Sequence, residues 1–134
     1  KSTVKDKGLN HQIIFSGKRE NVRLYLDHAE VFVLPTKETG EGSPVALIEA
    51  MANGKVVLGS DVPGIKDQLI HYPEYLFKAE DASILTQKLK WVMRNTLEEN
   101  KKLGKAFREF AEKKYSIQRE VKEHEHMYKN LMRL

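Results

Sequence analysis

The chain has 134 residues, and 40% of them are hydrophobic, which is enough to bury the core of one compact domain. Its net charge of +4 leaves nucleic acid, an anionic membrane face or a phosphorylated ligand open as partners. The lack of cysteine excludes disulfides and thiolate metal sites, and no apolar run approaches the roughly 18 residues of a membrane span. Because the chain starts at Lys1 rather than Met, we expect it to be truncated, and the lack of a membrane span and of cysteine leads us to expect a soluble, cytosolic protein.

The first third of the chain predicts a strand, a short helix and a second strand. Residues 12–15 are a short apolar run closed by Ser16-Gly17, which is typical of a buried strand entering a turn. Residues 21–27 have the mixed apolar spacing of a short helix. Residues 30–35 form a β-branched run that ends at a proline, so a second strand is expected there.

The next segment predicts a buried helix between two strands. Ser43 is expected to cap this helix, with Pro44 at its first position, where the missing N–H costs nothing. Residues 45–52 are apolar nearly all round, and Asn53-Gly54 is a typical left-handed helix end. Further strands are expected at residues 56–59 and 75–77, with a short helix at 65–70 between them.

The last third predicts three amphipathic helices. The first follows Asp81 as its N-cap, the second follows Asn95, and the third opens at Ser116. The third helix carries one narrow apolar seam, made of Ile117, Val121, His124, Tyr128 and Leu131. The second helix carries a run of basic residues interleaved with glutamates, as on a solvated helix face, at Lys101, Lys102, Lys105, Arg108, Lys113 and Lys114.

The order of these elements predicts the fold class. Strands that alternate with helices and are apolar throughout indicate an α/β fold, here a partial doubly wound parallel sheet of the Rossmann-like kind with C-terminal helices. We expect residues 1–115 to form the ligand-binding domain and 116–134 a separate C-terminal helix. In such folds ligands bind at the carboxyl ends of the strands, so the loops after Phe15, Leu34 and Leu58 are the candidate sites.

One motif, together with the segments that surround it in order, indicates a family. Seven residues separate Glu41 from Glu49, and this loop and helix resemble the E-x7-E signature of glycosyltransferase family 4, the "glycosyl transferases group 1". The surrounding segments at residues 14–17, 29–35 and 55–64 resemble the family's strands and small-residue loop in the correct order. Glu38 is a rival to Glu41, but only Glu41 has both the spacing and the following glycine.

The resemblance implies the C-terminal domain of a retaining, two-Rossmann-domain (GT-B) enzyme whose donor is a nucleotide diphosphate sugar. UDP-hexose and UDP-N-acetylhexosamine are the first candidates, and the pathway we expect is bacterial surface polysaccharide or lipopolysaccharide synthesis. By position in the motif, Glu49 holds the ribose, and Glu41 contacts the transferred sugar near the reacting carbon. A carboxylate suits the ribose because it accepts charge-assisted hydrogen bonds from both hydroxyls.

The helix start next to this motif suits a diphosphate, because the first amides of a helix lack partners within it and attract anions. Gly42 allows the ligand to approach the backbone closely. The donor-binding residues expected here are Gly42, Ser43, Pro44, Val45, Ala46 and Leu47. By resemblance, Gly17, Lys18 and Arg19 border the base and diphosphate, although a surface turn with two solvated cations explains them equally well.

The sequence also departs from the family pattern. Pro63 replaces one glycine of a glycine pair before Gly64, which leaves the backbone contacts of that loop open, and Asp67 stands where an acid often follows. Ser43 takes the place of a larger apolar residue beside the sugar. The family's phosphate-binding arginine and lysine and its acceptor domain lie upstream of this segment, so we expect the fragment to be inactive alone and its partner to be that N-terminal acceptor domain.

Two further expectations concern cofactors and a rival function. No metal is expected: His124 and His126 are two residues apart on a helix and do not share a face. The alternative hypothesis is a non-catalytic basic module that binds nucleic acid or anionic membrane through its later helices. The family interpretation instead implies no nucleic acid partner and a cytoplasmic protein with peripheral contact at the inner face of the membrane.

Overall fold

A computed structural model describes residues 2–39 and 41–132, and its centre is a parallel sheet. The sheet contains β1 (Val31–Leu34), β2 (Val56–Ser60) and β3 (Leu76–Phe77) in the order β1-β2-β3. Val31 lies opposite Val56, and Gly59 lies opposite Leu76. Because all three strands run in the same direction, their carboxyl ends share one edge. The predicted α/β fold with a parallel sheet is confirmed.

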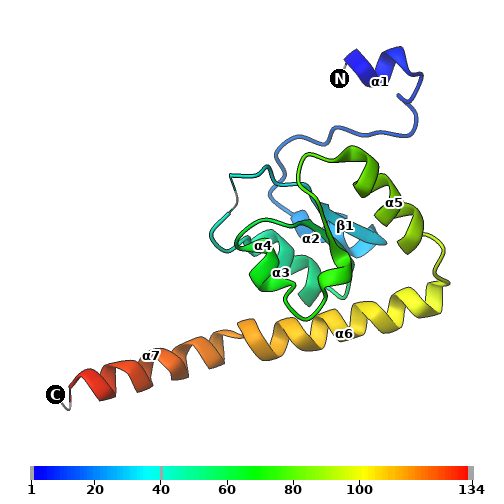
Figure 1. Cartoon of the computed structure of the whole chain (residues 1–134). Coiled ribbons are helices and arrows are strands. Elements are labelled where there is room, and N and C mark those ends of the chain that lie inside the picture. Colours follow the sequence, from blue (N-terminus) through cyan, green and yellow to red (C-terminus); the bar gives the residue numbers. More distant parts are fainter. Residues whose placement is uncertain (1, 40, 133–134) are drawn as a thin grey trace.

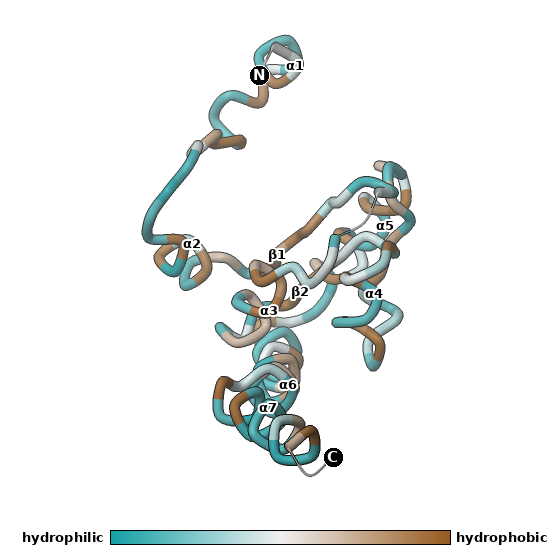
Figure 2. Tube along the Cα trace, turned by 90° about the vertical axis from the view of Figure 1, so that its left-hand side faces the viewer, coloured by the Kyte–Doolittle hydropathy of each residue, from teal (hydrophilic) through white to brown (hydrophobic). Residues whose placement is uncertain are grey.

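The helices cover the sheet on both sides (Figures 1 and 2). Two of them, α3 and α6, lie together on one side, whereas α5 contacts β3 on the other side. The C-terminal helix α7 extends away from the sheet beyond α6. The helices are α1 (Ser2–Asp6), α2 (Val22–His28), α3 (Val45–Ala52), α4 (Ile65–Gln68), α5 (Ala82–Val92), α6 (Leu97–Tyr115) and α7 (Ile117–Leu131), with a 3-10 turn at Pro73–Tyr75.

The core lies between β2 and the pair formed by α3 and α6. Every residue of β2 is buried, because it is the central strand, whereas the residues of β1 at the sheet edge are only half-buried. Phe107 of α6 and Leu47 of α3 are fully buried. The two helices meet where Gly104 approaches the backbone of Gly54, and a Cβ at Gly104 would lie 2.0 Å from the Gly54 carbonyl oxygen. This contact sets how closely α3 packs on α6.

Two helix starts carry side-chain caps that satisfy unpaired amides. The Asp81 carboxylate accepts from the N–H groups of Ser83 and Ile84, both at 3.0 Å, so its predicted role as the N-cap of α5 is confirmed. At α6, Thr96 and Glu99 form a reciprocal capping box, in which the Thr96 hydroxyl accepts from the Glu99 N–H. The Glu99 carboxylate in turn accepts from the Thr96 N–H at 2.7 Å and from the Thr96 hydroxyl at 2.9 Å, and these two hydrogen bonds lower the pKa of Glu99.

The strand predicted at residues 12–15 is wrong. The N–H groups of Gln12 and Ile13 both donate to the Leu9 carbonyl oxygen, at 3.0 and 3.1 Å, so a turn after α1 uses the donors that a strand would need. Ile14 is 87% exposed. A strand forms only beside another backbone, and within residues 2–39 and 41–132 the only strand paired with β1 is β2. The apolar run by itself does not provide that neighbour.

The predicted start of α3 is off by one residue. Pro44, and not Ser43, is the N-cap, with an extended ψ of 104°, and no side chain caps this helix. The Ser43 hydroxyl instead accepts a hydrogen bond from Gln68. The predicted helix end is confirmed, because Gly54 has a φ of +68°, which favours glycine.

The C-terminal helix begins where it was predicted to begin. Ser116 separates α6 from α7 with an extended backbone, and no residue described for α7 is buried. The seam residues Ile117, Val121 and Tyr128 are 65%, 48% and 57% exposed. No helix within residues 2–39 and 41–132 is both long and apolar enough to cross a bilayer.

Candidate functional site

Three loops meet at the carboxyl edge of the sheet, where α/β folds bind ligands. The loop after β1 runs to the start of α3 and contains Glu41. The loop after β2 contains Pro63 and Gly64 and leads into α4, and the loop after β3 leads into α5. Of the three loops predicted from the sequence, those after Leu34 and Leu58 follow strands in the structure, whereas the loop after Phe15 does not.

The backbone of the second loop holds the Glu41 turn in place. The Glu41 N–H donates to the Pro63 carbonyl oxygen at 3.3 Å, and the Thr36 hydroxyl donates to the Glu41 carboxylate at 3.0 Å. Gly64 has a φ of +84°, and a Cβ there would lie 2.1 Å from the Glu41 carbonyl oxygen and 2.5 Å from that of Gly42. The turn can occupy this position only because residue 64 is glycine.

Helix α4 also holds the turn that contains Glu41, through a side-chain hydrogen bond. The side chain of Gln68 is 2% exposed, and its Nε2 donates to the Ser43 hydroxyl at 3.1 Å. The Gly64 N–H donates to the Asp67 carboxylate at 3.1 Å, which holds the start of α4. Gln68 could not be singled out from the sequence, because it follows two other polar residues, Lys66 and Asp67, in this short helix.

The start of α3 has three exposed residues close to one another. Val45, Ala46 and Glu49 are exposed, and residues three or four apart on a helix are neighbours on its surface. The Glu49 carboxylate makes no hydrogen bond or ion pair within residues 2–39 and 41–132. The expectation of three unpaired amides needs correction, because the buried Leu47 donates its N–H to the Pro44 carbonyl oxygen at 3.1 Å.

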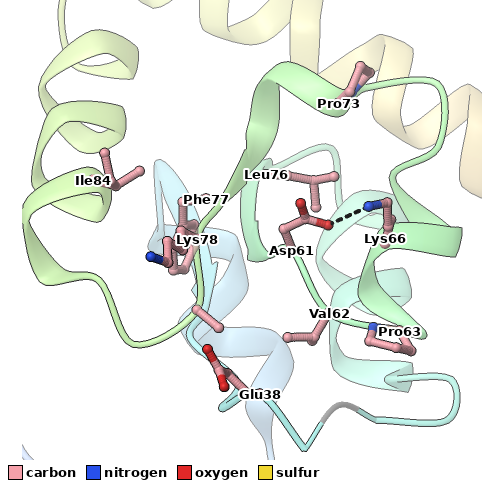
Figure 3. Close-up of a pocket in the computed structure, with 11 residues that line it drawn as sticks. Glu38, Asp61, Val62, Pro63, Lys66, Pro73, Leu76, Phe77, Lys78 and Ile84 are labelled. Carbon is pink, nitrogen blue, oxygen red and sulfur yellow. Dashed lines mark ion pairs between the residues drawn. The ribbon is translucent and has the colours of Figure 1, made fainter.

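A cleft of about 500 Å³ lies at the same edge of the sheet (Figure 3). Asp61 and Lys66 form an ion pair of 3.0 Å beside it, and Glu38 and Lys78 also reach it. None of the residues predicted to bind a donor lines this cleft; its lining is Glu38, Asp61, Val62, Pro63, Lys66, Pro73, Leu76, Phe77, Lys78, Ala79 and Ile84. The rival acid Glu38 therefore lies in this cleft, while Glu41 lies in the adjoining turn.

The loop before α2 carries the three residues that were predicted to border the base and diphosphate. Gly17, Lys18 and Arg19 are all exposed, and Gly17 has a φ of +65°. No hydrogen bond or ion pair within the described part of the chain involves these residues. Their role beside the base and diphosphate stays a prediction.

The basic residues of α6 are partly paired along the helix. Lys105 lies 3.7 Å from Glu109, and Arg108 lies 3.4 Å from Glu112. Lys114 donates to the Asp67 carbonyl oxygen at 3.3 Å and lies over the ring of Phe110. This pairing is typical of a solvated helix face.

A parallel α/β sheet with the spaced acids Glu41 and Glu49 near its carboxyl edge, beside a helix start, is the arrangement that the resemblance to GT-B glycosyltransferases implies. The comparison with known families agrees: the profile described as "Glycosyl transferases group 1" matches residues 1–110. The chain belongs to the glycosyl transferases group 1 family.

Two curated relatives are glycosyltransferases of polysaccharide synthesis. The chain is 42% identical over 57 residues to the amylovoran biosynthesis glycosyltransferase AmsK of Erwinia amylovora, covering 40% of this chain and 14% of the relative. It is 34% identical over 87 residues to the putative teichuronic acid biosynthesis glycosyltransferase TuaC of Bacillus subtilis, covering 65% and 21%. The matches thus span about a fifth or less of each relative's length.

Solved structures share the fold over nearly the whole chain. Sucrose-phosphate synthase from Thermosynechococcus elongatus superposes with a TM-score of 0.84 at 25% identity, over 98% of this chain and 33% of that one. A glycosyltransferase from Rickettsia africae gives 0.87 at 17% identity, over 98% and 35%. HepE of Anabaena, solved in complex with UDP, gives 0.82 at 16% identity, over 99% and 35%.

Proposed function

We propose that this chain binds the donor of a retaining glycosyltransferase, and that the donor is a UDP-hexose or a UDP-N-acetylhexosamine. The observation that carries the proposal is the exposed start of α3, where Val45 and Ala46 are the first residues of the helix and the exposed Glu49 follows within about one turn. The names of AmsK and TuaC support a role in polysaccharide synthesis, and we propose bacterial surface polysaccharide or lipopolysaccharide as the product. The UDP bound to HepE supports uridine as the base.

In this proposal the helix amides, Glu49 and Glu41 each bind a different part of the donor. The two amides stabilise the diphosphate, because the start of a helix attracts anions. Glu49 accepts hydrogen bonds from the two ribose hydroxyls. Glu41, oriented by Thr36, contacts the transferred sugar near its reacting carbon and is the candidate catalytic residue. The same amides stabilise the charge that develops on the leaving diphosphate, so the proposal requires no metal ion.

The complete reaction requires an acceptor-binding domain, and this is part of the proposal. In the proposed arrangement that domain faces the carboxyl edge of the sheet and receives α7, whose apolar seam is exposed. Nucleotide sugars are cytoplasmic metabolites, so we place the reaction in the cytoplasm, with peripheral contact at the inner face of the membrane. No nucleic acid takes part.

The test is a titration of the isotope-labelled chain with UDP, in which the NMR chemical shifts of the backbone amides report binding. We expect saturable binding of one UDP, with the largest shifts at Val45, Ala46 and Glu49. Glu49→Ala removes two charge-assisted hydrogen bonds worth about 1.5–3 kcal/mol each, so the Kd should rise at least about 100-fold. Glu120→Ala, an exposed glutamate on α7, is the matched control and should leave the Kd unchanged.

A titration with polyanions tests the alternative function, which is binding of nucleic acid or anionic membrane. If the basic helices of this chain bind nucleic acid, heparin or single-stranded DNA should bind without defined stoichiometry and lose affinity steeply with salt. That result, combined with no saturable shift from UDP at Val45 or Ala46, would overturn the proposal.

A further inference from the structure

A buried amide in α4 contacts the turn that carries Glu41. Gln68 is 2% exposed, its Nε2 donates to the Ser43 hydroxyl, and its Oε1 is buried without a partner in the described part of the chain. A buried, unpaired amide oxygen destabilises a fold, and an apolar side chain of similar size would fill the same space without that penalty. The polar side chain of Gln68 therefore contributes one visible interaction, and it is with the turn.

The neighbouring residues hold the same turn by independent contacts. The Pro63 carbonyl accepts from the Glu41 N–H, and Gly64 lies directly against the carbonyl oxygens of Glu41 and Gly42. The Asp67 carboxylate holds the Gly64 N–H at 3.1 Å. The turn at residues 41–43 is thus fastened at both ends to the segment 63–68, which we call the β2–α4 clamp.

Glu49 is held by a different part of the fold. It lies on α3, whose opposite face buries Leu47 and Met51 in the core beside β2 and α6. The position of Glu49 therefore depends on core packing, whereas the position of Glu41 depends on the clamp. The two acids can be perturbed separately.

We propose that Gln68 and Gly64 are positioning residues that determine recognition of the donor's sugar and leave recognition of its nucleotide unchanged. This inference rests on the proposed function, in which Glu41 contacts the sugar and Glu49 the ribose. Loss of the clamp should free the turn, so that Glu41 no longer meets the sugar in a defined orientation. Binding of UDP alone should be preserved.

The decisive variant is Gln68→Leu, which removes the bond to Ser43 and fills the same volume. A ligand-free measurement comes first: the heteronuclear NOE of the amides of Glu41, Gly42 and Ser43 should fall in the variant, while its melting temperature stays equal to or above that of the wild type. Lys66→Gln, on the exposed side of the same helix, is the control and should change neither quantity.

The second measurement compares the Kd of UDP with that of UDP-glucose, UDP-galactose and their N-acetylated forms. For the sugar nucleotide that the wild type binds most tightly, Gln68→Leu should raise the Kd about ten-fold, the effect of losing one hydrogen bond to a charged group. The Kd of UDP should change less than about two-fold. Ser43→Ala should reproduce part of this loss, and the double variant should lose less than the sum of the two single losses.

Each outcome has one meaning. Three results would overturn the proposed role of the clamp. The NOE values could be unchanged, or the losses of affinity in the double variant could be additive. A stably folded variant could also lose as much affinity for UDP as for the sugar nucleotide. Gly64→Ala gives a second route, since its Cβ must displace the Glu41 carbonyl, and a stably folded variant with wild-type sugar recognition would also overturn it. A wild type that binds no UDP would overturn the proposed function instead, and the NOE values would still decide whether the clamp orders the turn.

Discussion

Replacing Gly104 by alanine tests whether backbone contact between α3 and α6 sets the position of the site helix. An alanine Cβ would lie 2.0 Å from the Gly54 carbonyl oxygen, about 1 Å inside the shortest contact that real Cβ atoms show, and backbone lies on both sides. The helices must separate, and overpacking of this kind costs about 3 kcal/mol when nothing flexible can move. Alanine regains about 1 kcal/mol of helix propensity. The net loss is therefore about 2 kcal/mol.

The assay is reversible denaturation by urea, with thermal melting alongside. A loss of 2 kcal/mol corresponds to a decrease in melting temperature of roughly 6–10 °C in a domain of this size. Lys105→Ala, exposed on the same helix and joined to Glu109 by one surface ion pair, is the control and should stay within about 0.5 kcal/mol. If Gly104→Ala were as stable as the wild type or more stable, helix propensity would dominate and the contact reasoning would be refuted.

Three smaller predictions concern the helix caps and α7. Thr96→Ala removes the N-cap of α6 and should lower the free energy of unfolding by about 1 kcal/mol in urea denaturation. Because the pKa of Glu99 is lowered in the folded state, its carboxylate stabilises the fold at pH values above the ordinary pKa of 4.5. This stabilisation disappears as the pH falls through the lowered pKa of the folded state. Glu99→Gln should therefore flatten the stability profile in that acidic range; an unchanged profile would contradict this. The exposed seam of α7 should bind a hydrophobic dye, and Val121→Lys should weaken the fluorescence while changing stability by less than about 0.5 kcal/mol.

Much of the fold could be predicted because local signals and tertiary context agree. The proline after Leu34, the glycine at position 54 and the N-cap Asp81 each mark an element boundary that the structure also has. Residues 12–15 show where local pattern is insufficient. Their apolar run is compatible with a strand, but strand formation depends on a neighbouring backbone, and the sequence of the run carries no information about that neighbour.

The site was predictable in its spacing and less so in its contacts. Helical periodicity is enough to place Glu49 on the same face as Val45. The role of Ser43 was not predictable, because its hydroxyl suits a helix cap equally well, and only the fold brings Gln68 within 3.1 Å of it. The close approach of Gly64 to Glu41 joins loops of two different strands, so it too follows from the tertiary structure.

The most direct test of donor binding compares UDP with 2′-deoxy-UDP in the wild type and in Glu49→Ala. If Glu49 holds the ribose hydroxyls while the first amides of α3 hold the diphosphate, the wild type should bind the deoxynucleotide about ten-fold more weakly, and Glu49→Ala should bind both ligands with the same reduced affinity. Equal affinity of the wild type for the two nucleotides, or an undiminished preference for UDP in the variant, would contradict the account.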